Sequence, residues 1–72
     1  MNTILFPLRG EFVALCDLLK LTGITTSGGE GKALVAMGVV KVDGQVESRK
    51  TAKIRAGQVV ECHGLRVAVG PA

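Results

Sequence analysis

The spacing of the apolar residues changes at Gly38, and this change sets the order of the secondary structure. Before Gly38, four apolar residues follow the i, i+3, i+4, i+7 pattern that marks one face of an amphipathic helix. They are Phe12, Leu15, Cys16 and Leu19. After Gly38 the period is two, as in strands with one buried face. The order predicts an α+β domain in which helices precede strands.

The first expected helix runs from Glu11 to Leu21. Glu11 at its start and Lys20 near its end carry the charges that the helix dipole favours at those ends. Gly23 is expected to end it. The preceding segment, Asn2 to Leu8, contains β-branched and alternating apolar residues and ends beside a proline. That composition is typical of a short edge strand or an ordered arm.

The second expected helix runs from Gly28 to about Met37 and is closed by Gly38. Ser27 and Glu30 are spaced as a capping box, in which each residue satisfies an unpaired backbone N–H at the helix start. We assign the apolar face of this helix to Ala33, Leu34 and Met37.

The first turn of this helix is rich in glycine, and each glycine costs about 1 kcal/mol relative to Ala in a helix interior. The glycines are Gly28, Gly29 and Gly31. Either the turn is loosely formed or another group comes close to its backbone. A phosphate could bind the amides there with Lys32 one turn in, but an ordinary capped helix explains the same residues. A nucleotide-binding P-loop is excluded, because Thr26 and Ala33 occupy its glycine and hydroxyl positions.

Two hairpins are expected after the helices. Asp43-Gly44 joins residues 39–42 to 45–47 and suits the positive φ angles of a tight turn. His63-Gly64 is expected to join residues 59–62 to 65–69 as a two-residue loop. A further turn is expected at Ala56-Gly57. In the second hairpin, cross-strand pairing is expected between Cys62 and Leu65, Val60 and Val67, and Glu61 and Arg66. The expected fold class is α+β, with two N-terminal helices packed on a small, mostly antiparallel sheet.

Charge is distributed unevenly along the 72 residues. The net charge is +3, and residues 1–31 sum to −1 while residues 32–72 sum to +4. Such an asymmetry indicates a polyanionic partner, although many small domains are mildly basic for no special reason. Phe6 and Phe12 are the only aromatic residues. If RNA binds, phosphates and shape are therefore expected to matter more than stacked bases.

Metal, catalytic and membrane functions find little support. Cys16 and Cys62 lie in apolar patterns and are expected to be reduced core residues; with His63 they cannot supply the four ligands of a structural zinc. His63 is a lone imidazole in a turn, so no catalytic residue, metal or cofactor is expected and the protein is not expected to be an enzyme. No apolar run approaches the ~20 residues that span a bilayer. The first residues lack a signal peptide's charged start, so a cytoplasmic location is expected.

A second basic segment runs from Glu47 to Arg55. Four of its nine residues are Lys or Arg, with hydroxyl residues between them. It and Lys32 flank the first hairpin, so Lys32, Lys41 and this segment could form one surface. The alternative is a solvated loop without a ligand.

Together these motifs resemble the S-four RNA-binding domain, or αL motif. The resemblance covers about residues 11–62 and rests on Leu15-Cys16-Asp17-Leu18-Leu19-Lys20, Gly23, Ser27-x-x-Glu30-x-Lys32, Gly38-Val39-Val40-Lys41-Val42-Asp43-Gly44-Gln45-Val46 and Lys53-Ile54-x-x-Gly57. Length and motif order are similar to those of free-standing bacterial members. We therefore interpret residues 1–72 as a single RNA-binding domain.

The resemblance implies that the second helix and the following loops grip structured RNA. Ribosomal or transfer RNA is the candidate ligand, and ribosomal or RNA-processing proteins are candidate partners. The expected RNA-binding residues are Ser27, Gly28, Gly29, Lys32, Lys41, Arg49, Lys50, Lys53 and Arg55. Gly28 stands where many members have Arg, so one phosphate contact is absent, and Gly31 stands where Ala is common. The alternative function is a protein–protein interaction adaptor with the same fold and no RNA ligand.

Overall fold

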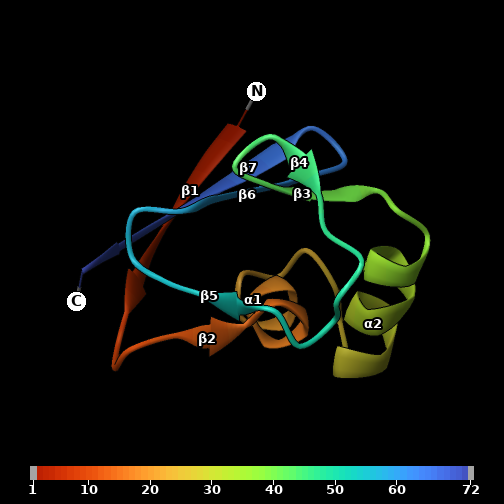
Figure 1. Cartoon of the computed structure of the whole chain (residues 1–72), viewed down its shortest axis with the longest axis horizontal. Coiled ribbons are helices and arrows are strands. Elements are labelled where there is room, and N and C mark those ends of the chain that lie inside the picture. The colour runs from red at the N-terminus through yellow and green to blue at the C-terminus, as the bar shows by residue number, and fades with distance from the viewer. Residues whose placement is uncertain (1, 72) are drawn as a thin grey trace.

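The computed structural model describes residues 2–71, with the backbone alone for Asn2 and Gly28. Met1 and Ala72, the two ends of the expected domain, lie outside the described residues. The elements are β1 (Asn2–Leu8), β2 (Val13–Ala14), α1 (Leu15–Leu21), α2 (Gly28–Ala36), β3 (Val40–Val42), β4 (Gln45–Val46), β5 (Lys53–Ile54), β6 (Val59–Cys62) and β7 (Leu65–Pro71). Figure 1 shows two layers, with one sheet on one side and both helices beside a smaller sheet on the other.

The larger sheet has the strand order β1-β7-β6-β3-β4, and the smaller sheet pairs β2 with β5. Within the larger sheet only β1 and β7 run parallel, and the other neighbours are antiparallel. The α+β class and the mostly antiparallel sheet are therefore confirmed. The segment Asn2–Leu8 is an edge strand, which was one of its two expected forms. The description of the helices as N-terminal is wrong, because β1 precedes them.

Both predicted hairpins are confirmed. Asp43 and Gly44 have φ angles of 52° and 85°, and His63 and Gly64 have φ angles of 51° and 77°. Positive φ at both central residues is the geometry whose twist matches that of antiparallel strands. The second hairpin has the expected register, with Val60 opposite Val67, Glu61 opposite Arg66 and Cys62 opposite Leu65.

Helix α1 begins at Leu15, four residues later than predicted. Val13 and Ala14 instead pair with Ile54 and Lys53 in the smaller sheet, so Glu11 and Phe12 lie outside the helix. The N-cap residue Ala14 provides no side-chain hydrogen bond. The first two backbone N–H groups of the helix find their acceptors elsewhere in the chain: Leu15 N donates to Ala52 O at 2.9 Å, and Cys16 N donates to Lys50 O at 3.0 Å. The chain before Leu15 can therefore remain extended.

The end of α1 follows the prediction. Lys20 lies in the last turn, where a cation interacts favourably with the helix dipole. Gly23 has a φ angle of +83°, and its N–H donates to Lys20 O. This left-handed residue ends the helix as expected.

Helix α2 begins as predicted, but only half of the capping box is present. Ser27 Oγ accepts a hydrogen bond from Glu30 N at 3.2 Å. The Glu30 carboxylate does not return to the backbone, because its Oε2 accepts from the Thr26 hydroxyl at 3.1 Å. The start of the helix is thus held by three polar side chains, those of Thr26, Ser27 and Glu30.

The predicted apolar face of α2 is wrong in two of its three residues. Ala33 and Met37 are exposed, and Leu34 is half-buried. The buried positions are Gly31 and Val35. A Cβ at Gly31 would lie 3.0 Å from Cys16 O. The group that comes close to the glycine-rich turn is therefore the backbone of α1, and this contact rotates the larger apolar residues away from the core.

The core lies between the larger sheet and the helices. Its fully buried side chains come from α1, α2 and the inner faces of both sheets: Leu15, Leu18, Leu19, Val35, Val40, Ile54, Val60 and Val67. Cys16 and Cys62 are buried and free, as predicted. Burial raises the pKa of the Cys62 thiol, so this thiol stays neutral at neutral pH.

The contact at Gly31 leads to a prediction with a matched control. Gly31→Leu forces a side chain against the α1 backbone and should lower the free energy of unfolding by about 1–3 kcal/mol. Gly29→Leu should not lower the free energy of unfolding, because a Cβ at Gly29 meets only Ser27 Oγ, at 4.0 Å. It should raise this free energy by up to about 0.8 kcal/mol, since leucine has the higher helix propensity. Urea denaturation of the two variants measures the difference. Equal effects at the two positions would contradict a tight helix contact at Gly31.

Candidate nucleic-acid interface

The basic segment between β4 and β5 is attached to the body of the protein through its backbone. The bonds from Leu15 and Cys16 to Ala52 and Lys50 fix it against the start of α1. Ala52 and Ile54 are buried, whereas the residues that alternate with them are exposed. Side chains alternate between the two faces of an extended chain. The burial of Ala52 and Ile54 therefore turns Thr51, Lys53 and Arg55 outward.

Four exposed side chains of this segment line one surface depression, which we call the basic loop surface. They are Arg49, Thr51, Lys53 and Arg55. Three of the four are cations, and no carboxylate lines this depression within the described part of the chain. Such a surface suits the phosphates of a nucleic acid.

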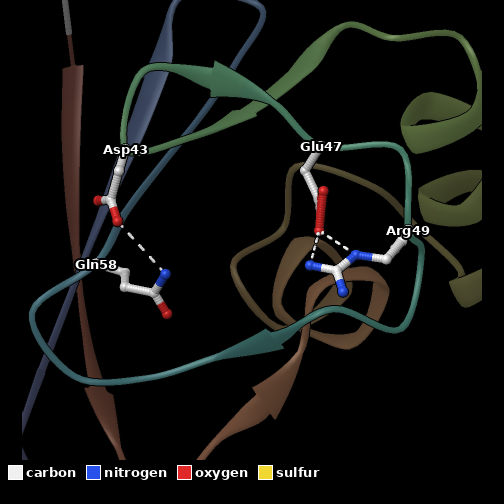
Figure 2. Close-up of polar contacts among 4 residues, drawn as sticks. All are labelled: Asp43, Glu47, Arg49 and Gln58. Carbon is white, nitrogen blue, oxygen red and sulfur yellow. Dashed lines mark hydrogen bonds and ion pairs between the residues drawn. The ribbon is translucent and has the colours of Figure 1, made fainter.

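Arg49 is held by an ion pair with Glu47. Figure 2 shows the contact, in which Arg49 Nε and Nη2 both lie 2.9 Å from Glu47 Oε1. The Arg49 side chain is 78% exposed and the Glu47 side chain 18% exposed. An exposed pair of this kind contributes little to stability. Its effect is to orient the guanidinium while its outer side stays open to a ligand.

Phe12 lies beside the basic loop surface, where the sequence analysis did not place it. Lys53 Nζ is 5.0 Å from the centroid of the Phe12 ring, and Arg55 Cζ is 5.9 Å from it. The ring was assigned to the buried face of the first helix, yet Phe12 is 42% exposed. The signal that could have placed it is the short extended run before Leu15, which contains no capping side chain.

The first hairpin borders the basic loop surface on its other side. Val42, Asp43 and Gln45 line a second hollow together with Arg49 and Lys53. Asp43 links this hairpin to β6: its Oδ1 accepts from Val59 N at 2.9 Å, and its Oδ2 accepts from Gln58 Nε2 at 3.4 Å. The second of these bonds is drawn in Figure 2.

The start of α2 meets the basic segment through Cys16. The Cys16 N–H is bonded to Lys50 O, and the Cys16 carbonyl faces Gly31. Two segments that the sequence marked as phosphate sites therefore pack around one residue of α1. Gly28 is the first residue of α2, and Lys32 is exposed one turn in.

Lys41 is placed apart from these residues. Its neighbours Val40 and Val42 turn toward the core, so Lys41 projects from the outer face of the larger sheet. There it stands opposite Glu61, which stands opposite Arg66. The structure brings Arg49, Lys53 and Arg55 together and leaves Lys41 in a row of mixed charge.

Within residues 2–71, no group of three or more His, Cys, Asp or Glu side chains is placed to hold a metal ion. No helix in the same range is long and apolar enough to cross a membrane.

The fold agrees with the comparison to known families. Residues 6–70 match the model of the S4 domain, and the chain belongs to the S4 domain family. The protein YbcJ of Escherichia coli (strain K12) is 56% identical over 57 residues, which cover 79% of this chain and 81% of YbcJ.

Two solved structures are similar to the chain. The solution structure of YbcJ from E. coli reveals an αL motif involved in RNA binding; it has a TM-score of 0.69 and 48% identity, and the match covers 97% of this chain and 87% of that one. The 30S ribosomal protein S4e from Thermoplasma acidophilum has a TM-score of 0.60 and 27% identity, over 81% of this chain and 31% of that one.

The bonds made by Asp43 predict how firmly the first hairpin is held beside the basic loop surface. Asp43→Ala removes both acceptors and places an alanine at a positive φ angle, so the free energy of unfolding should fall by about 1–2 kcal/mol. Asp43→Asn keeps an acceptor oxygen and tolerates this backbone conformation, so its loss should be smaller. Chemical denaturation compares the two variants. A loss as large for Asn as for Ala would show that these bonds do not anchor the turn.

Proposed function

We propose that this protein binds structured RNA, with ribosomal or transfer RNA as the ligand, chiefly through phosphate contacts from the basic loop surface. The observation that carries the proposal is the outward row of Arg49, Lys53 and Arg55 on a segment whose backbone is fixed to α1. A segment whose backbone is already ordered loses less conformational freedom on binding, which favours affinity. Membership of the S4 domain family supports the same function, as does the RNA-binding motif of YbcJ.

The start of α2 contributes a second set of contacts in this proposal. The helix N-terminus presents backbone N–H groups that attract anions, and Lys32 is exposed one turn in. Ser27 acts as the N-cap, so its hydroxyl is already engaged with Glu30 N. Gly28 and Gly29 would then serve by letting a phosphate approach the backbone, in place of the arginine that many S-four proteins carry after the serine.

Binding without catalysis is the role that this surface supports. Its cations would neutralise phosphates, and nothing in the arrangement requires a bond in the RNA to break. The protein would act in the cytoplasm, beside ribosomal or RNA-processing proteins. Binding of about 4–6 phosphates would make log affinity fall with log salt at a slope of about −3 to −5.

A comparison of two double variants tests where RNA binds. Lys53→Gln/Arg55→Gln removes two cations from the basic loop surface and should weaken RNA binding at least about tenfold, while the salt slope becomes less steep by about 2. Lys41→Gln/Arg66→Gln removes the same charge from the outer face of the larger sheet and should have a much smaller effect. Both are measured by fluorescence titration of a structured RNA at several salt concentrations, after thermal melts confirm folding.

Three outcomes would contradict the proposal. Equal losses in the two double variants would mean that net charge matters and position does not. A larger loss in the Lys41/Arg66 variant would place the RNA on the outer face of the sheet. Absence of RNA binding at low salt, together with a protein partner retained after nuclease treatment, would favour the interaction adaptor.

A further inference from the structure

Phe12 belongs to two surface features at once. Lys53 and Arg55 of the basic loop surface lie within 6 Å of its ring centroid, at the distances of cation–π contacts. The same residue also lines an apolar groove of about 350 Å³, together with Pro7, Val13 and Leu21. Phe12 therefore stands where the basic loop surface and the apolar groove meet.

The pairing of β2 with β5 accounts for this position. Val13 stands opposite Ile54, and both pack into the core. Ala14 stands opposite Lys53, and continuing the register by one residue brings Phe12 opposite Arg55. Because side chains alternate between the faces of a strand, Phe12, Lys53 and Arg55 share the outer face. The exposure of Phe12 thus follows from the burial of its neighbours.

Three cations lie at or beside the apolar groove. Exposed Arg9 lies on its rim, and Lys53 and Arg55 lie beside Phe12. Leu21, from the last turn of α1, is 63% exposed and forms another part of the lining. An occupant that fits should have a flat apolar part and carry negative charge next to it. An RNA nucleotide has this chemistry: a base with a phosphate on either side.

We propose that the apolar groove receives an unpaired base of the bound RNA, stacked on Phe12, while the adjoining phosphates contact Lys53 and Arg55 on one side and Arg9 on the other. The inference rests on the proposed RNA-binding function and names the kind of RNA. Stacking on an aromatic ring is stronger than an exposed cation–π contact, so the two cations can leave the ring for phosphates when RNA binds.

This arrangement selects for RNA that is not fully paired. Bases inside an A-form helix are stacked on one another and cannot enter a groove, whereas bases in bulges, loops and junctions can be splayed out onto aromatic side chains. The basic loop surface would hold the backbone of a stem, and Phe12 would take the unpaired nucleotide beside it. The preferred ligand is therefore a stem that adjoins an unpaired base.

Two short RNA duplexes of the same sequence test the proposal, one blunt and fully paired and the other with a single bulged 2-aminopurine. The full chain should bind the bulged duplex about tenfold more tightly than the paired one, which is the effect of one stacked base. The fluorescence of the 2-aminopurine should fall on binding. Phe12→Leu should remove both the preference and the quenching while keeping affinity for the paired duplex. Phe12→Trp should restore both.

Leu5→Ala is the matched control, because Leu5 is 80% exposed on β1 and is absent from the lining of this groove. It should leave the preference unchanged. Equal binding of the two duplexes by the wild-type chain would overturn the inference. Equal weakening of both duplexes by Phe12→Leu would also overturn it, because Phe12 would then only position the cations. Self-association through Phe12, detected by sedimentation, would assign the groove to a second copy.

The two proposals fail in different ways. If Lys53→Gln/Arg55→Gln lowers the affinity for both duplexes while Phe12→Leu changes neither affinity, the RNA-binding function is supported and the base site is contradicted. If neither duplex binds at low salt, the RNA-binding function itself falls, and the base site with it.

Discussion

Two backbone hydrogen bonds determine where the basic loop surface lies. The first N–H groups of a helix have no partner within the helix, and Ala14 has no side chain to cap them. The carbonyls of Ala52 and Lys50 take this role for Leu15 and Cys16. The basic segment thereby becomes the cap of α1. Its position depends on main-chain atoms, so its cationic side chains are not needed to hold it in place.

Cys16 connects the other parts of the structure to this cap. Its N–H bonds to Lys50 O, and its carbonyl lies where a Cβ of Gly31 would be 3.0 Å away. The glycine at position 31 therefore allows α2 to pack closely on α1, and this packing offsets the poor helix propensity of glycine. No comparable helix contact requires glycine at position 29, since a Cβ there would meet only Ser27 Oγ. The presence of a residue with poor helix propensity at this position is therefore consistent with a role in ligand approach.

The sequence predicted well those features that depend on nearby residues. Each hairpin is defined by a two-residue turn and a period of two, and these local signals were enough for the register of Val60 with Val67. The start of α1 could not be predicted, because the strand that pairs with Val13 and Ala14 lies about forty residues further along the chain. Phe12 fitted the helical spacing by coincidence, and its assignment to the core concealed it as a surface residue.

The candidate site divides in the same way. Arg49, Lys53 and Arg55 could be proposed as candidates from the sequence because their charge is visible there. Lys41 faces away from them because it alternates with the buried Val40 and the half-buried Val42 along β3. The prediction of one surface considered charge alone and did not take this alternation into account. The face of α2 was misjudged because the group expected to come close to the glycine-rich turn was not identified as the backbone of α1. Sequence spacing does not distinguish a glycine that lets two helices pack closely from one that only weakens a helix.

A net charge of +3 is small, and its arrangement matters more than its size. On the outer face of the larger sheet, Lys41 and Arg66 stand on either side of Glu61, so their fields partly cancel. On the basic loop surface the nearest carboxylate is that of Glu47, and the ion pair presents its cationic partner to solvent because Arg49 is far more exposed than Glu47. The positive potential is therefore concentrated where Phe12 and the apolar groove begin. A polyanion drawn to this surface meets an aromatic ring beside the phosphate contacts.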